Sequence, residues 1–210
     1  MTFIKNYHIG MHKNISEDVI RAIYTEKTIR VYQAYKPEIA IPALAAGTLV
    51  PPFKMTRMTW IKPSFNWMMY RSYFATNPGQ EIVLGIDITR EGFSWALNNS
   101  VLSEFCQSIH SSREKWKNLL ANKPGRIQWD PERDWRIQPI PGLRTIQIGL
   151  SGEAVERYVN EWIVNIEDLS PLARMIYASV KNCDPPPALP SASERPYPLD
   201  TITAQTISAR

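Results

Sequence analysis

The chain has 210 residues, of which 44% are hydrophobic, and this length favours a single domain with one well-packed core. Its formal net charge of +4 indicates acidic partners only if the positive side chains cluster. Two cysteines without CxxC spacing exclude a disulfide framework, and no apolar run is long enough to span a membrane, so we expect a cytoplasmic protein without membrane association.

The first elements predicted along the chain are an N-terminal helix, a strand and a second helix. Ser16 can cap a helix that begins directly after it, so residues 1–28 are predicted to form a helical extension. Ile29 to Tyr35 has the alternation of a strand, which puts Gln33 on its more apolar face. Pro37 favours the start of a helix and Gly47 its end, so a short helix is expected between them.

The middle of the chain is predicted to interleave strands with helices. Ser64 can cap a helix that runs through Tyr73, directly after a short strand that Pro63 ends. The clearest strand is Glu81 to Thr89, in which Ile or Leu occupies every second position. The other predicted elements are a strand at 58–61, helices at 93–97 and 113–121, strands at 126–129 and 144–150, a Ser151-capped helix to 163, and a helix from Ser170.

These elements predict an α+β fold, with packed helices and a mixed or antiparallel sheet in a single core domain at residues 29–183. From Asp184 onward, prolines and polar residues dominate, and few large apolar side chains are present to offset the entropy of ordering. We therefore expect a flexible tail at residues 184–210. A proline-rich docking segment for a partner is the alternative.

The segment Lys54 to Ser72 has the most pronounced chemical character in the chain. Between Glu38 and Glu81 there is no acidic residue, and this interval contains the four cations Lys54, Arg57, Lys62 and Arg71. Aromatic side chains lie between these cations in the sequence. Phosphates and bases are bound by such a combination, so the segment predicts a nucleotide or a nucleic acid as ligand.

Signature motifs of common enzyme classes are absent from the sequence. It contains no GxxxxGK[ST], GxGxxG, GxSxG or HExxH. Of the three histidines, His8 and His12 are four residues apart but have no carboxylate nearby, so we expect no metal. Acid–base chemistry would then depend on carboxylates, tyrosine or lysine.

Several long strings of the chain closely resemble the family named domain of unknown function 4291. The resemblance extends over roughly Arg30 to Val180, and the family name implies no activity. The strings are IRVYQAY, FKMTRMTWIKPSFNWMMYRS, QEIVLGIDITREGF, QWDPERD and IQIGLSGEAVERYVNEWIVNIED.

The order of residues is also similar to that of enzymes with the ADP-ribosyltransferase fold. Their core begins with a strand that carries a tyrosine beside a polar NAD-contacting residue, followed by a helix that ends near a glycine; Tyr32, Gln33 and Gly47 stand in this order. The resemblance implies a split sheet, NAD as substrate, and Gln33 and Glu132 as catalytic residues. Gln33 replaces the His or Arg common at its position, and neither Glu-x-Glu nor Gln-x-Glu precedes Glu132.

The same resemblance implies how NAD would be bound. Arg71 or Lys62 would pair with the pyrophosphate, and Glu132 would stabilise the cation that develops as the bond to nicotinamide loosens. The other candidate cofactor-binding residues are Arg30, Tyr32, Ser64 and Tyr70. Structural roles are the alternative for these residues: aromatics and methionines can fill a core, Arg30 can pair with Asp87, and QWDPERD can be a turn.

Two hypotheses follow for the function. The first is NAD-utilising glycosyl transfer to a protein or nucleic-acid acceptor. The second is a non-catalytic module that binds a nucleotide or nucleic acid on the cationic-aromatic surface. A catalytic site should bring Glu132, Gln33 and Arg71 into one cleft, whereas a binding module should spread the cations along an open face.

Overall fold

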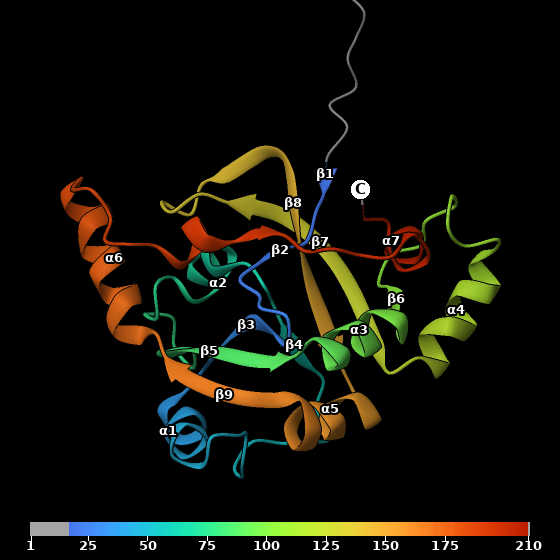
Figure 1. The fold of residues 1–210 in the computed structure, drawn as a ribbon, viewed down its shortest axis with the longest axis horizontal. Coiled ribbons are helices and arrows are strands. Elements are labelled where there is room, and N and C mark those ends of the chain that lie inside the picture. The colour runs from blue at the N-terminus through green and yellow to red at the C-terminus, as the bar shows by residue number, and fades with distance from the viewer. Residues whose placement is uncertain (1–16, 210) are drawn as a thin grey trace, which may run out of the picture.

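Two β-sheets lie at the centre of the protein, whose computed structural model describes residues 17–209 (Figure 1). The strands are β1 (Glu17–Asp18), β2 (Arg21–Ala22), β3 (Thr28–Tyr35), β4 (Thr59–Ile61), β5 (Ile82–Thr89), β6 (Ser100–Leu102), β7 (Gly125–Arg133), β8 (Pro139–Leu150), β9 (Ile163–Asp168) and β10 (Arg195–Pro196). The α-helices are α1 (Pro37–Ala46), α2 (Phe65–Ser72), α3 (Arg90–Asn98), α4 (Arg113–Asn122), α5 (Glu153–Arg157), α6 (Ser170–Asn182) and α7 (Thr201–Ile207).

The two sheets differ in size and meet at one point. The smaller sheet has the antiparallel order β3-β5-β9. The larger sheet has the order β1-β8-β7-β6, with β4 also paired to β8, and it contains both parallel and antiparallel neighbours. A single bridge between Tyr32 and Lys62 connects β3 to the end of β4. The α+β fold with a mixed sheet is confirmed.

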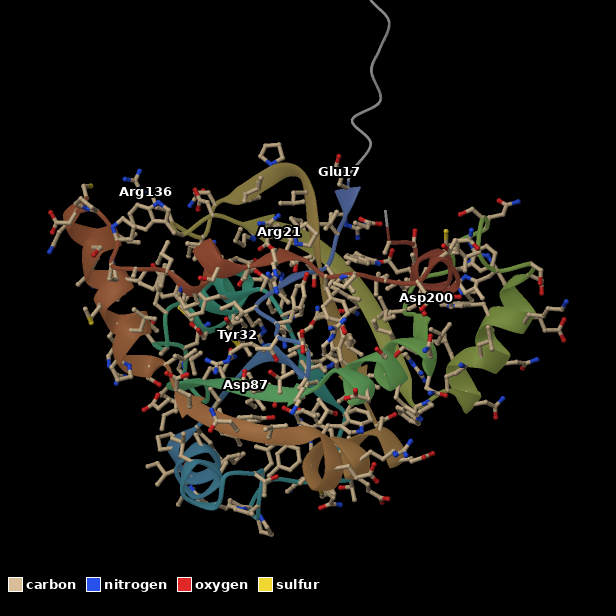
Figure 2. The ribbon with its side chains drawn as sticks, in the orientation of Figure 1. Glu17, Arg21, Tyr32, Asp87, Arg136 and Asp200 are labelled. Atoms are coloured by element: carbon tan, nitrogen blue, oxygen red, sulfur yellow. The ribbon has the colours of Figure 1, made fainter. Side chains whose placement is uncertain are left out.

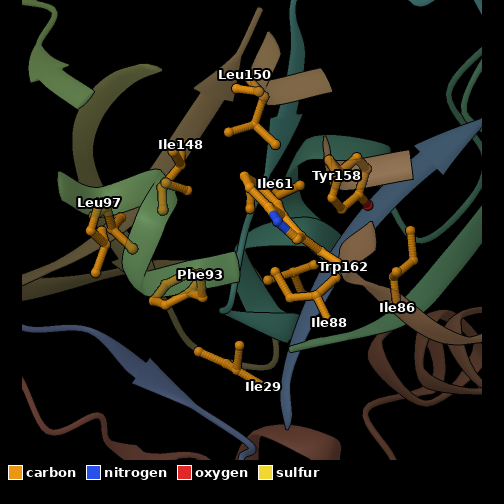
Figure 3. Close-up of a cluster of buried hydrophobic side chains, with 14 of the residues drawn as sticks. Ile29, Ile61, Ile86, Ile88, Phe93, Leu97, Ile148, Leu150, Tyr158 and Trp162 are labelled. Atoms are coloured by element: carbon orange, nitrogen blue, oxygen red, sulfur yellow. The ribbon is translucent and has the colours of Figure 1, made fainter. Parts of the chain in front are cut away.

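The main hydrophobic core lies between the two sheets and is closed by helix α3 (Figure 3). Side chains alternate between the two faces along each strand, so one face of each sheet lines this core, as the sequence pattern predicts. Ile29, Ile86 and Ile88 come from the smaller sheet, and Ile61, Ile148 and Leu150 from the larger one, while Phe93, Leu97, Tyr158 and Trp162 fill the space between them.

A second apolar cluster lies on the other face of β3 and β5, where α2 and α6 pack. Tyr32 and Phe65 are fully buried there, and their rings meet edge to face at 5.5 Å. Met68 and Met69 of α2 are buried in the same cluster, as expected for residues that fill a core.

Several predicted element boundaries are confirmed because local capping chemistry sets them. α1 begins at Pro37 and ends at Gly47, which has the left-handed backbone that favours glycine. Ser64 caps α2, and its hydroxyl accepts a hydrogen bond from the backbone N–H of Trp67.

The predicted N-terminal helix is corrected. The described part of the N-terminal extension is not helical, because Glu17–Asp18 pairs with β8 and Arg21–Ala22 pairs with β10. These pairings join segments far apart in the sequence, so local pattern could not reveal them. The predicted helix start at Ser16 and the pair His8 and His12 lie outside the described residues.

The predicted helix after Ser151 is confirmed to within one residue of its expected end at 163. It comprises α5 and a π-helical turn, Tyr158–Trp162, after which the chain turns extended as β9. Residues 163–168 pair with β5. The predicted cap is wrong, because Gly152 occupies the N-cap position and the Ser151 hydroxyl donates instead to the carbonyl of Pro124 at 2.8 Å.

The expectation of a flexible C-terminal tail is also wrong for the residues described. Residues 184–209, here called the C-terminal strap, cross the molecule from α6 to α7 (Figure 1). Tyr197 and Ile207 are buried, and Trp129 Nε1 donates to the carbonyl of Ile207 at 2.7 Å. A few buried anchors and the β10–β2 pairing hold a segment whose average composition is polar.

Candidate functional site

Two adjoining pockets form a groove along the end of β3, strand β4 and helix α2. The inner pocket has a volume of about 210 Å³ and lies beside Gln33, Trp60 and the end of α2. The outer pocket has a volume of about 430 Å³ and lies between the start of α1 and the loop that contains Phe53. They share the lining residues Tyr35, Met58 and Thr59, so we treat them as one cationic groove.

The charge of this groove has one sign. Lys62 and Arg71 line the inner pocket, and Lys36, Lys54 and Arg57 line the outer one. No Asp or Glu is among the described residues that line either pocket. An ion pair between Lys36 and Glu38 at 3.9 Å is exposed and is therefore weak. The acid-free interval of the sequence thus becomes a cationic surface in three dimensions, of a kind that suits an anion.

Gln33 forms a rigid part of the inner wall. Its amide nitrogen donates to Thr59 Oγ1 at 2.7 Å and to the carbonyl of Trp60 at 3.0 Å, which uses both amide hydrogens. Its oxygen accepts from the Tyr158 hydroxyl at 2.8 Å. Burial raises the pKa of Tyr158 well above its usual range and that of Tyr35 to about 12, so both phenols stay neutral. Gln33 can therefore offer a ligand only an acceptor.

Lys62 lies at the inner end of the groove with 7% of its surface exposed. Its ammonium group donates to the carbonyl of Trp60 at 3.2 Å and lies 5.2 Å from the centre of the Trp67 ring. Burial, with a further contribution from Arg71, lowers the pKa of Lys62 to about 7, and the more distant Asp130 offsets this only in part. This amine therefore loses its proton more readily than an exposed lysine does.

Arg71 lies in the last turn of α2, where the partial negative charge of the helix end favours a cation. The loop that follows the helix holds this turn, since Asn77 Nδ2 donates to the carbonyl of Arg71 at 3.0 Å. With its amide oxygen facing the guanidinium, Gln80 accepts from Arg71 Nη1 at 2.7 Å. The guanidinium is exposed, so it can reach an anion in the groove.

Glu132 lies outside the groove, in a separate pocket of about 360 Å³ that Arg21, Arg133 and Glu194 also line. Its Oε1 accepts from the Ser64 hydroxyl at 2.8 Å and from the backbone N–H of Arg133 at 2.8 Å. Burial raises the pKa of Glu132, and these two hydrogen bonds lower it in part. The structure therefore does not bring Glu132 into one cleft with Gln33 and Arg71.

Glu194 of the C-terminal strap completes the separate pocket. Its Oε1 accepts from the backbone N–H of Phe65, at the start of α2, at 2.7 Å. Arg21 lies beside this part of the strap (Figure 2) and donates to the backbone carbonyl of Glu194 at 2.8 Å. Burial raises the pKa of Glu194 to about 8, and the neighbouring charge of Glu132 adds to the rise.

Three further candidates have structural partners away from the groove. Arg30 forms ion pairs with Asp87 at 2.6 Å and Glu167 at 2.7 Å, which bind β3, β5 and β9 together and raise its pKa. Tyr32 is buried in the interior (Figure 2) and does not reach the groove surface. Tyr70 stacks under the guanidinium of Arg133, whose central carbon lies 3.7 Å from the ring centre.

The groove thus unites Gln33, Lys62 and Arg71 from the sequence-based candidates, together with the cations Lys54 and Arg57. Sequence reasoning missed the remaining lining residues that carry polar or aromatic groups. One signal was available, since the strand alternation places Tyr35 on the same face as Gln33. The missed residues are Tyr35, Lys36, Phe53, Thr59, Trp60 and Gln80.

Comparison with known proteins identifies the family of the chain. No curated protein matches it. No helix among residues 17–209 is long and apolar enough to cross a membrane. The family model described as Domain of unknown function (DUF4291) matches residues 19–197, a range that contains the whole cationic groove and extends to Tyr197 of the strap. The chain belongs to this family.

Proposed function

We propose that this protein binds an adenine dinucleotide, NAD in the first place, in the cationic groove and uses it for glycosyl transfer to a protein or nucleic-acid acceptor. The observation that carries the proposal is the charge of the groove. Five cations line its two pockets, and no carboxylate accompanies them among the described lining residues. Phosphate esters are the biological anions that such a set of lysine and arginine side chains binds best.

The two-lobed shape favours a dinucleotide over a mononucleotide. Each pocket has its own cations and its own aromatic side chain, Trp60 in the inner pocket and Phe53 in the outer one. A molecule with two ring systems joined by a pyrophosphate matches this repetition. The pocket volumes, about 210 and 430 Å³, fall together in the range of small-molecule sites, roughly 300–1,000 Å³.

The glycosyl-transfer part of the proposal has its support in the fold. A split sheet is what the similarity to ADP-ribosyltransferases implies, and here two sheets meet through the single Tyr32–Lys62 bridge. The groove lies at this junction, because Lys62 forms the bridge and also lines the inner pocket. The carboxylate Glu132, to which the similarity assigned transition-state stabilisation, lies in the separate pocket, so another group must act on the ribose.

A non-catalytic module for nucleic acid is the second candidate, and the outer pocket favours it. Lys36, Lys54 and Arg57 are all exposed at the edge of the molecule, where a longer phosphate chain could continue past the groove. Binding of this kind would depend steeply on salt, because each neutralised phosphate releases counterions.

Thermal melting with and without ligand tests the proposal. NAD, ADP-ribose and nicotinamide would be compared at millimolar concentration, and nicotinamide release would be measured in parallel. We expect NAD and ADP-ribose to raise the melting temperature, because a ligand that binds only the native state stabilises it by about 2.7 kcal/mol at a hundred times its Kd. No shift with either compound, together with salt-sensitive retention of RNA or DNA, would favour the non-catalytic module.

A further inference from the structure

Lys62 differs from the other cations of the groove in its surroundings. The outer-pocket lysines Lys36 and Lys54 are exposed, whereas Lys62 is 7% exposed and lines the inner pocket. An ammonium group has three hydrogens to donate, and the carbonyl of Trp60 is the acceptor that the inner wall provides, at 3.2 Å. A charged ammonium is therefore poorly solvated at this position.

The charges around Lys62 also oppose protonation. Arg71 of α2 lines the same pocket and repels a second cation. No carboxylate in the described part of the chain lies within ion-pair distance of its amine. The acid that acts on it at longer range is Asp130 of β7, whose Oδ2 already accepts from Gln147 Nε2 at 2.6 Å. Such an amine is an activated nucleophile, as desolvated lysines beside another cation commonly are.

We propose that Lys62 is the nucleophile of the cationic groove and that it takes the ADP-ribosyl group of NAD onto its Nζ atom. This inference depends on the proposed function. The lone pair of Nζ forms a bond to C1′ of the ribose that carries nicotinamide. The C1′–N bond to nicotinamide breaks, its electron pair neutralises the pyridinium ring, and nicotinamide leaves uncharged. The new ammonium then loses one proton to solvent, so no additional reactant is required.

The architecture of the groove supports this step over one that relies on a carboxylate. No described lining residue of the groove is an Asp or Glu that could stabilise a free oxocarbenium ion. Attack by an amine instead assists departure of the leaving group, so less positive charge has to develop on the ribose. Arg71 and the outer-pocket cations would hold the pyrophosphate while Lys62 faces the sugar.

Peptide mapping by mass spectrometry after incubation with NAD tests this inference. In the wild type, we expect one ADP-ribosyl group on the peptide that contains Lys62. Lys62→Met roughly preserves the length of the side chain and buries no charge. NAD should therefore still raise the melting temperature of this variant, but the adduct and the release of nicotinamide should be lost. Lys117→Met, on the exposed face of α4, serves as the matched control and should retain both.

The pH profile adds a readout that a structural role would not change. With the pKa of Lys62 near 7, adduct formation should rise about tenfold between pH 6 and pH 8 and then level off, whereas an exposed lysine gains about tenfold per pH unit up to pH 10. ADP-ribose in place of NAD controls for glycation. Equal labelling by ADP-ribose, spread over exposed lysines, would overturn the inference.

The remaining outcomes separate this inference from the proposed function. If NAD raises the melting temperature and nicotinamide is released without an adduct on Lys62, the nucleophile assignment is wrong while glycosyl transfer stands. If NAD neither stabilises the protein nor releases nicotinamide, both proposals fail.

Discussion

The backbone N–H of Tyr32 donates to the carbonyl of Lys62 at 2.7 Å, and this bond joins the two larger sheets of the protein. The side chains next to this bond lie on opposite faces of β3. The Tyr32 ring points into the apolar cluster under α2, while the adjacent Gln33 points to the other face and lines the inner pocket. The amine of Lys62 is thereby held beside Gln33 at the inner end of the groove.

Replacing Arg71 tests its proposed role in holding the phosphates of a ligand. We expect Arg71→Ala to weaken NAD binding by about tenfold to a hundredfold, the equivalent of a charged hydrogen bond of about 1.5–3 kcal/mol. The melting temperature without ligand should hardly change, because the guanidinium is exposed. Titration calorimetry would compare it with Arg174→Ala, an exposed arginine on α6 that lies away from the groove. Equal affinities for the two variants would remove Arg71 from the binding site.

Replacing Glu132 should leave turnover nearly unchanged. Glu132→Gln keeps the size of the side chain and an oxygen that can accept from Ser64 and from the Arg133 N–H. Since Glu132 lies in the separate pocket, nicotinamide release should stay within about twofold of the wild type. A loss of two to three orders of magnitude, roughly the effect of removing one transition-state contact, would instead make Glu132 the catalytic carboxylate.

Packing of the C-terminal strap should contribute measurably to stability. Tyr197 is buried against Tyr24 and Phe93, so Tyr197→Ala should lower the free energy of unfolding by about 3 kcal/mol. Ile202 on α7 is 77% exposed, and Ile202→Ala should change it by less than about 0.5 kcal/mol. Urea denaturation measures both. Equal, small effects would mean that the strap is solvated rather than packed.

Glu194 should make the free energy of unfolding fall as the pH rises. Its pKa is raised from the ordinary 4.5 to about 8 in the folded protein, so between these values the native state binds a proton that the unfolded chain has lost. Stability from this group is complete below pH 4.5 and falls as pH rises toward 8, by at most about 1.4 kcal/mol per pH unit.

Glu194→Gln should remove that slope, because the amide oxygen can still accept from the Phe65 N–H but carries no ionisable proton. Chemical denaturation of both proteins at several pH values, from about pH 5 to pH 8, gives the comparison. Glu132 interacts with Glu194, so the difference between the two curves reports Glu194 together with its effect on Glu132. Parallel curves would contradict the prediction.

Local chemistry allowed part of this structure to be predicted from sequence. α1 begins at Pro37 and ends at Gly47, and α2 begins after Ser64, because each signal acts on backbone groups only a few residues away. The acid-free interval likewise indicated that Lys62 and Arg71 belong to one cationic surface, and both line the inner pocket.

Tertiary structure alone decided which polar groups meet. Glu132 pairs with Ser64 and shares a pocket with Glu194, far away in sequence, and Gln33 is held by Tyr158 from beyond the middle of the chain. The strap is ordered by a few buried anchors, although its average composition predicts disorder. Such pairings depend on the free energy of burying whole surfaces together, which pattern within a short window does not contain.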